Sequence, residues 1–173
     1  MKLKIFPFKK VKSTNSTAIR LINQNIKFGV VTSERQYKGR GQGTNRWISN
    51  YGNIFLSIFF PLKRNLSIKN ITKINLNVVK KVIKKHINEK INIKLPNDIL
   101  INQSKICGIL QEIIFKNNIK YIIIGIGINL NNSPIIPNYC TSYLNKYSKK
   151  NIKKLELIKE LKRNFEKKIE NFI

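Results

Sequence analysis

The spacing of apolar and polar positions along the chain predicts three helices. In an amphipathic helix, apolar side chains recur roughly every three or four residues, so that they share one face. Such stripes run through residues 15–25, 67–88 and 152–172. Ser13 or Thr14 is the candidate N-cap of the first helix, because a hydroxyl just before the stripe can accept a hydrogen bond from a free backbone N–H.

Short apolar runs bounded by turn residues predict strands in most of the remaining chain. The predicted strands are residues 28–34, 53–60, 91–94, 99–102, 106–115 and 120–130. Pro61 stops the second strand, and turns at 102–104 and 117–118 join the later strands as hairpins. Strands linked by hairpins, with helices before, between and after them, predict an α+β domain rather than a doubly wound parallel sheet.

The phrase GIGIN contains Gly125 and Gly127 at the end of the last predicted strand. A Rossmann loop needs a third glycine and a following helix, whereas this phrase continues into NNSP at 131–134. We therefore expect the two glycines to let a ligand or a neighbouring strand approach the backbone closely.

Length and cysteine content indicate one intracellular domain. A chain of 173 residues can bury a sufficient core as a single domain, predicted here to span 1–173. Cys107 and Cys140 are too few and too far apart for a disulfide framework or a zinc site, which favours a reducing compartment, and Cys107 is expected to pack as a small buried residue. No apolar run has the length of a signal peptide or a membrane span, so we expect a cytoplasmic protein without a membrane partner.

The chain is strongly basic, with 34 Lys and Arg against 8 Asp and Glu and a net charge of +26. The lysines extend from Lys2 to Lys168, and Ile, Asn and Lys dominate throughout. This spread favours a codon bias over a selected nucleic-acid-binding stripe, although a basic nucleic-acid-binding module remains the alternative from a different functional class. The charge should favour acidic partners at low salt.

Rare residue types narrow the chemistry further. His86 is the single histidine, so a histidine-based triad or multi-histidine metal site would depend on it. Asp98 is the single aspartate and lies in KLPNDIL, where it is either a turn residue or a chemical group. The glycine-rich stretch GRGQGTNRW at 39–47 could cradle phosphate, cap a small ligand or form an ordinary surface turn.

Five phrases in this order resemble the catalytic domain of biotin protein ligases. They are STN at 13–15, Gln36 followed by GRGQGTNRW, KLPND at 94–98, KICGILQE at 105–112 and IGIGIN at 124–129. The resemblance covers the chain from about residue 11 to the last predicted helix. It implies a mixed, mostly antiparallel sheet flanked by helices, related to lipoate ligases and class II aminoacyl-tRNA synthetases.

The resemblance also implies a reaction in two steps. The biotin carboxylate attacks the α-phosphate of ATP to give biotinyl-5′-AMP and pyrophosphate, and a lysine of the biotin carrier domain of a carboxylase then takes the biotinyl group. ATP with Mg²⁺ and biotin are thus the implied substrates and metal, without a tightly bound prosthetic group. A ligase or transferase for lipoate or octanoate on the same fold is the alternative within this class.

Roles carried over from the family fall into two sets. The implied biotin contacts are Ser13, Thr14, Asn15, Gln36, Gly39, Arg40, Lys105, Gly108 and Leu110. The implied nucleotide contacts are Arg46, Trp47, Lys94, Asn97, Asp98 and Asn129, with Asp98 also a candidate magnesium ligand. Lys105 and Arg40 are the implied catalytic residues, because fixed positive charge can bring an anionic carboxylate and a triphosphate together. Each residue has a structural alternative: Ser13 and Thr14 could only cap a helix, Trp47 could be core and Lys105 an exposed hairpin residue.

The chain departs from the family pattern in its glycine loop and at its ends. The common loop reads GRGRxGRxW, whereas Gln42 and Asn45 replace two arginines here, which is expected to weaken the hold on phosphate and adenylate unless Arg46 compensates. Leu95 replaces a tryptophan. There is no room before residue 13 for a DNA-binding helix-turn-helix or after residue 173 for a small β-barrel, so we expect a ligase without repressor function. Its oligomeric state is left open by the sequence.

Overall fold

The computed structural model describes residues 2–62 and 67–170. Within these residues, seven strands form one sheet in the order β1-β2-β3-β7-β6-β5-β4. Their bounds are β1 Ile5–Val11, β2 Gly29–Gln36, β3 Ile54–Pro61, β4 Ile91–Lys94, β5 Asp98–Ile101, β6 Ser104–Lys116 and β7 Ile119–Ile128. Only β1 and β2 pair in parallel among these strands. The predicted mixed, mostly antiparallel sheet and the α+β class are therefore confirmed.

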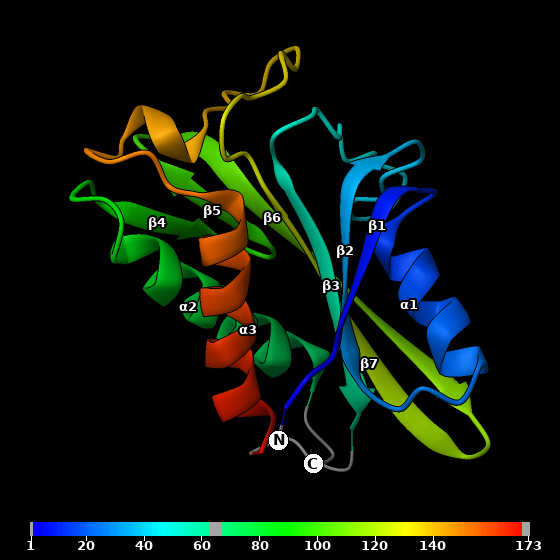
Figure 1. Cartoon of the computed structure of the whole chain (residues 1–173). Helices are drawn as coiled ribbons and strands as arrows, with labels where there is room; N and C mark the ends of the chain where they lie inside the picture. The colour runs from blue at the N-terminus through cyan, green and yellow to red at the C-terminus, as the bar shows by residue number, and fades with distance from the viewer. Residues whose placement is uncertain (1, 63–66, 171–173) are drawn as a thin grey trace.

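Helices cover both faces of the sheet, as Figure 1 shows. Helix α1 (Thr14–Asn23) packs on one face, where Ala18 and Ile22 join Phe59 and Ile123 in a small apolar cluster. Helices α2 (Ile68–Lys84) and α3 (Lys154–Ile169) pack on the other face over the main core. Burial of these apolar helix stripes against the sheet is the main stabilising contribution to the fold.

The alternation of side chains along β7 separates the two faces. Residues 122, 124, 126 and 128 are isoleucines that face the main core under α2 and α3. The odd-numbered positions face the α1 side, because successive side chains of a strand point to opposite faces. On that side Tyr121 and Ile123 are followed by Gly125 and Gly127, so β7 itself presents no side chain where the glycines begin.

All three predicted helices are present in the described residues, with shifted ends. Ser13 is the N-cap of α1, and its Oγ accepts a hydrogen bond from Ser16 N–H at 3.3 Å. Helix α2 ends before the predicted residue 88, and the predicted residues 171–172 of the last helix lie outside the described range. His86 follows the end of α2, with its Nε2 3.2 Å from Glu160 Oε1 on α3.

The predicted hairpin turns are confirmed by their backbone conformation. Asn102, Gln103, Asn117 and Asn118 all have φ between 46° and 63°. This left-handed region is strained for most residues but tolerated by Asn, and two successive residues there match the twist of an antiparallel hairpin.

Two elements were absent from the sequence interpretation. Strand β1 carries Pro7 and charged residues at exposed positions, so its sequence lacks the apolar run of a buried strand. It lies at the edge of the sheet, where such residues are tolerated. A short 3₁₀ helix at Leu144–Lys146 was also missed. Pro61 was predicted to follow the second strand, but it is the last residue of β3. Cys107 is fully buried, as predicted. No helix in the described residues is long and apolar enough to cross a membrane.

Candidate active site

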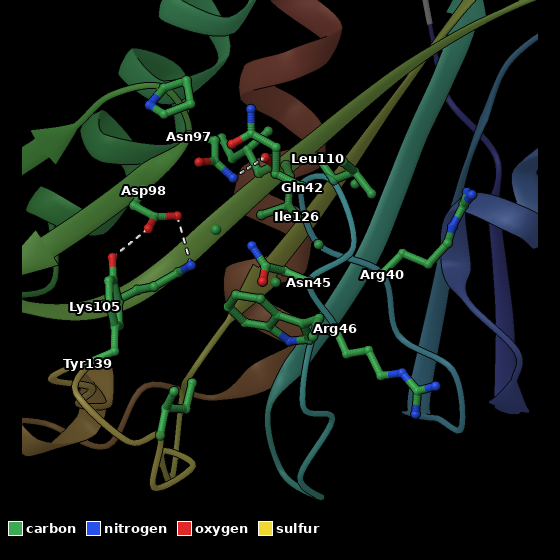
Figure 2. A pocket seen from close by; sticks show the side chains of 18 of the residues that line it. Arg40, Gln42, Asn45, Arg46, Asn97, Asp98, Lys105, Leu110, Ile126 and Tyr139 are labelled. Atoms are coloured by element: carbon green, nitrogen blue, oxygen red, sulfur yellow. Dashed lines mark hydrogen bonds and ion pairs between the residues drawn. The ribbon is translucent and has the colours of Figure 1, made fainter.

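A cavity of about 540 Å³ opens on the α1 side of the sheet, above the glycines of β7. Its walls come from five regions: the start of α1, the end of β2, the loop 40–47, the turn between β4 and β5, and the segment 136–139. The first half of β6 and the last part of β7 form its floor. Figure 2 labels side chains from the loop, from the turn between β4 and β5 and from the segment 136–139, together with side chains of the floor strands. A volume of this size is typical of a small-molecule site.

Nearly all the residues implied by the family resemblance line this cavity. They are Ser13, Thr14, Asn15, Gln36, Arg40, Arg46, Trp47, Lys94, Asn97, Asp98, Lys105, Gly108 and Leu110. Gln42 and Asn45, the positions at which the loop departs from the family, also line it. Tertiary structure thus brings together five phrases that are far apart in the sequence.

Gly39 and Asn129 lie beside the cavity rather than in its lining. Gly39 is buried at the base of the loop, where its carbonyl accepts a hydrogen bond from Trp47 N–H at 3.1 Å. Asn129 is 2% exposed and donates from Nδ2 to the Ser142 carbonyl at 3.1 Å. Their polar groups hold the loop and the chain after β7 in place, so direct contact with a ligand is not supported by their positions.

Hydroxyl and amide groups form a polar cluster at the start of α1. Gln36 Oε1 accepts hydrogen bonds from Thr14 N–H at 2.8 Å and from Thr14 Oγ1 at 3.2 Å. Ser57 Oγ lies 2.7 Å from Thr14 Oγ1 and 2.5 Å from Asn15 Oδ1. Ser57 was missed by the sequence interpretation, although a lone serine in the apolar strand NIFLSIFF was a signal. Because both partners of each bond are buried or partly buried, this cluster is preorganised for donor and acceptor recognition.

Arg40 is joined to the same cluster through Glu112. Glu112 Oε2 accepts hydrogen bonds from Asn15 Nδ2 at 2.7 Å and from Arg40 Nη2. Asn15 Nδ2 also donates to the Leu110 carbonyl at 3.3 Å. Glu112 ends the phrase KICGILQE, and no role was assigned to it from the sequence. Its carboxylate fixes the guanidinium of Arg40 at one side of the cavity.

The glycines of the floor are required by close approach of side chains. A Cβ added at Gly127 would lie 2.4 Å from Trp47 Cε2, and one at Gly108 would lie 2.8 Å from Trp47 Cζ3. A Cβ added at Gly125 would lie 2.3 Å from Asn15 Oδ1. Real Cβ atoms do not come this close to other heavy atoms. The expected close approach at Gly125 and Gly127 is therefore present, but it is made by side chains of the α1 start and the loop rather than by a neighbouring strand.

Lys105, Asp98 and Tyr139 form a charged cluster at the opposite side of the cavity (Figure 2). Lys105 Nζ lies 2.8 Å from Asp98 Oδ1, and Tyr139 Oη donates a hydrogen bond to Asp98 Oδ2 at 2.7 Å. The Lys105 ammonium is also 5.4 Å from the Trp47 ring centroid and 5.5 Å from that of Tyr139. Burial, together with the hydrogen bond to the Asp98 carboxylate and its charge, raises the pKa of Tyr139 well above its usual range. Tyr139 is thus a protonated donor at neutral pH, and it was not found from the sequence.

The turn between β4 and β5 is tied to β6 by Asn97. Its carbonyl accepts from Ile109 N–H at 2.9 Å, and its Nδ2 donates to the Ile109 carbonyl at 3.2 Å. Lys94 Nζ lies 4.9 Å from the Tyr139 ring centroid. The turn therefore holds Lys94 and Asp98 at the cavity edge.

The charge of the cavity lining suits an anionic ligand. Its basic side chains are Arg40, Arg46, Lys94 and Lys105, and its only carboxylate among the described residues is Asp98. Guanidinium and ammonium groups bind carboxylates and phosphates through charge-assisted hydrogen bonds. The described residues contain no group of three His, Cys, Asp or Glu side chains that could hold a metal ion by themselves.

These features define a small-molecule site whose charge suits an anionic ligand. The chain belongs to the biotin/lipoate A/B protein ligase family, whose model matches residues 7–129. It is 35% identical over 131 residues to the bifunctional ligase/repressor BirA of Bacillus subtilis (strain 168), an alignment that covers 72% of this chain and 39% of that protein. The chain thus spans about two fifths of the length of this curated relative.

Solved structures of biotin protein ligases share the fold. That of Aquifex aeolicus in complex with biotin and ATP is 23% identical, with a TM-score of 0.82 over 98% of this chain and 71% of the other. That of Leishmania major in complex with biotinyl-5-AMP is 24% identical, with a TM-score of 0.79 over 98% of this chain and 79% of the other. At these identities the likeness confirms the fold alone.

Proposed function

We propose that this chain is an ATP-dependent ligase that activates biotin as biotinyl-5′-AMP and transfers the biotinyl group to a lysine of a biotin carrier domain. The observation that carries the proposal is the cavity, which joins a cluster of amide and hydroxyl groups to a set of four basic side chains. Biotin carries both a polar ureido ring and a carboxylate. The cavity offers a separate partner for each end of such a molecule.

The polar cluster at the start of α1 is the proposed site for the ureido ring. Thr14, Asn15 and Gln36 already exchange hydrogen bonds there, together with Ser57. Ser13 lies beside them as the N-cap of α1. Gly108 and Leu110 of β6 would wall the thiophane ring and the valeryl chain, because both line the cavity and Leu110 supplies apolar surface.

Lys105 is the proposed direct partner of the reacting carboxylate, and Arg40 is proposed to add a second fixed positive charge from the opposite side of the cavity. The carboxylate oxygen attacks the α-phosphorus, and the bond from this phosphorus to the oxygen bridging to the β-phosphate breaks, with pyrophosphate leaving. Both reactants are anions, so fixed cations lower the cost of bringing them together and of the charge that develops. No protein nucleophile or proton transfer is needed in this step.

The nucleotide is proposed to lie along the loop and the β4–β5 turn. Arg46 and Lys94 line that part of the cavity and would contact phosphate oxygens, and Trp47 and Asn97 would flank the adenosine. Gly39 and Asn129 are proposed to support this wall, since they lie beside the lining and hydrogen-bond the loop and the chain after β7. In the second step the lysine amine of the acceptor attacks the activated carbonyl and AMP leaves.

Magnesium is proposed to arrive with ATP. Mg²⁺ is usually held by one or two carboxylates together with substrate phosphates and water, and Asp98 is the carboxylate that the lining offers. One carboxylate is enough for such a site, and Asp98 is the one acidic residue of the lining. A magnesium site built only from protein ligands would need more acidic side chains than the described residues bring together. The ion would neutralise phosphate charge.

Incubation with ATP, magnesium, labelled biotin and a biotin carrier domain tests the proposal. We expect label on the acceptor lysine and biotin-dependent exchange of pyrophosphate into ATP. A carrier domain with its target lysine changed to arginine is the control. Absence of both signals under conditions where a known ligase works would contradict the proposal.

The family model covers lipoate as well as biotin ligases, so the acid needs its own test. A dithiolane ring lacks the ureido donors and acceptors, and the polar cluster around Thr14 and Gln36 would gain nothing from it. We expect thermal stabilisation by biotin in excess of that by lipoate or octanoate at equal concentration. The reverse order would favour a lipoate or octanoate ligase.

A further inference from the structure

The segment 134–142 is fastened to the start of β6, next to the backbone of Lys105. Lys105 N–H donates to the Cys140 carbonyl at 2.9 Å, and Ser142 N–H donates to the Lys105 carbonyl at 2.9 Å. Thr141 Oγ1 donates to the Pro134 carbonyl and closes the segment on itself. The same segment that brackets the backbone of Lys105 therefore carries Tyr139.

The Tyr139 side chain returns from this segment to the cavity, where it meets Asp98 (Figure 2). The two carboxylate oxygens of Asp98 have different partners, since Oδ2 accepts from Tyr139 Oη at 2.7 Å and Oδ1 lies 2.8 Å from Lys105 Nζ. The Asp98 side chain is only 12% exposed, so water can replace the hydroxyl only in part. Without the tyrosine hydroxyl, the carboxylate loses the contact that fixes its rotation.

Rotation of Asp98 would also release Lys105. The Lys105 side chain is 20% exposed, and besides Asp98 it has only weaker aromatic contacts among those described, with the rings of Trp47 and Tyr139 at 5.4 and 5.5 Å. A flexible four-carbon side chain has many rotamers and needs a directional partner to stay in one of them. The Asp98 carboxylate is that partner.

We infer that Tyr139 is a positioning residue for substrate activation, holding Asp98 and through it the Lys105 ammonium at the cavity wall. The inference rests on the proposed function, in which Lys105 binds the carboxylate of the acid substrate. It adds a residue from outside the five phrases to the activation machinery. It also explains why the segment after β7 closes back onto the start of β6.

The hydroxyl and the ring of Tyr139 can be tested separately. Tyr139→Phe keeps the ring beside Lys94 and Lys105 and removes only the donor to Asp98. Tyr143→Phe is the matched control, because Tyr143 lies four residues further along and outside the cavity lining. Circular dichroism and thermal unfolding of the full chain establish that each variant is folded.

The readouts are biotin-dependent pyrophosphate exchange and calorimetric binding of biotin. We expect Tyr139→Phe to lower kcat/KM for biotin roughly tenfold, because a hydrogen bond to a charged group is lost. Tyr143→Phe should match the unchanged protein. An unaltered kcat/KM for biotin in folded Tyr139→Phe overturns the inference.

A double-mutant cycle tests whether Tyr139 acts through Lys105. In a Lys105→Met background, Tyr139→Phe should cause no further loss of biotin affinity, because the ammonium that it positions is gone. An equal loss in both backgrounds would show an independent effect and overturn the inference. If the unchanged protein neither binds biotin nor exchanges pyrophosphate, the proposed function itself fails. That outcome differs from one in which the unchanged protein is active and Tyr139→Phe has the same kcat/KM for biotin.

Discussion

Lys105 is the residue at which the charged and aromatic walls of the cavity meet. Its ammonium contacts Asp98 and lies over the rings of Trp47 and Tyr139, so its position is determined by three separate segments. Because the ammonium is only partly exposed, its charge is less screened than that of a surface lysine. A well-placed cation of this kind is expected to matter more for the reaction than for the fold.

Lys105→Ala should therefore lose far more in turnover than in folding stability. One donor to developing charge is worth ~3 kcal/mol, or roughly a hundredfold in rate, whereas a partly exposed ion pair contributes on the order of 1 kcal/mol to folding. Pyrophosphate exchange and thermal unfolding measure the two effects. Lys159→Ala, on the exposed face of α3, is the control and should change neither. A variant that only unfolds would contradict the catalytic role of Lys105.

Gly127 determines where the loop tryptophan can lie. Gly127→Ala would place a Cβ within 2.4 Å of the Trp47 ring, so the ring must leave the floor of the cavity. Trp47 is the only tryptophan in the chain, and its fluorescence emission should shift to longer wavelength as the ring becomes more exposed to water. Biotin affinity should fall together with this shift.

Gly41→Ala is the matched control for that prediction. Its added Cβ would come no nearer than 3.2 Å to the carbonyl of Asn45, which lies in the exposed stretch 42–46 of the loop and can adjust. Its fluorescence should stay close to that of the unchanged protein. Equal emission from Gly127→Ala and the unchanged protein would mean that the ring does not need this glycine.

At the scale of elements, α1 is held at its C-terminal end by a lysine from the β6–β7 hairpin. Lys116 Nζ donates to the carbonyls of Ile22 at 2.8 Å and Asn23 at 2.7 Å, and to Asn25 Oδ1 at 2.7 Å. A cation at this end satisfies free carbonyls and opposes the negative end of the helix dipole. The same helix carries the polar cluster at its other end.

Lys116→Met should lower the free energy of unfolding by about 1 kcal/mol, since the charge at the helix end and its hydrogen bonds are lost while the aliphatic stem is kept. Urea unfolding measures the change. Lys120→Met, in the same hairpin on β7, is the control and should lose less. Equal losses in the two variants would argue against a specific cap.

Helix α3 is tied to the N-terminal segment by Glu166. Its Oε1 accepts from Leu3 N–H at 2.6 Å and from Lys162 Nζ at 2.7 Å. Burial alone would raise the pKa of Glu166, but these hydrogen bonds and the Lys162 charge outweigh it, and the pKa is lowered. A carboxylate with a depressed pKa in the folded state stabilises the protein above its unfolded pKa of about 4.3, and this stabilisation is lost as pH falls through the folded value.

Glu166→Gln should accordingly reduce stability at pH 7 and flatten its decline with acid below about pH 5. Urea midpoints measured across the acidic range test this. Glu156→Gln, on an exposed position in the first turn of α3, is the control. A decline in Glu166→Gln as steep as in the unchanged protein would remove Glu166 as a source of the pH dependence.

At the scale of the whole molecule, the net charge of +26 predicts a salt-sensitive attraction to polyanions. We expect binding to duplex DNA to be weak and independent of sequence, and to fall steeply between about 50 and 200 mM salt, because it depends on counterion release. Filter binding or gel shift with two unrelated sequences measures both properties. Tight, sequence-dependent retention at physiological salt would instead favour a nucleic-acid-binding module.

Local sequence signals were sufficient for most elements and for most of the cavity lining. Helical stripes, the Ser13 cap and the asparagine turns depend on contacts within a few residues, so they could be predicted from the chain alone. Strand β1 could not, because only its pairing with β2 makes IFPFKKV a strand. Its edge position removes the apolar pattern on which sequence prediction depends.

Some residues of the candidate site could likewise be predicted from the sequence, and others could not. Phrases such as KLPND and KICGILQE identified residues whose types suit anion binding, and the cavity brings nearly all of them together. Ser57 and Tyr139 lie outside the marked phrases, and Glu112 ends one of them without an assigned role; each acts on a residue distant in the sequence. Gly39 and Asn129 lie in marked phrases, yet they support the cavity without lining it.

By itself, the sequence determined the α+β class, the family and the basic residues of the candidate site, because these depend on residue types and on their order. Tertiary structure alone decided which polar groups meet: Arg40 with Glu112, Trp47 with the β7 glycines, and Lys105 with Asp98 and Tyr139. The physical reason is that hydrogen bonds, ion pairs and ring contacts act over a few ångströms, and folding brings residues from distant parts of the chain within that range.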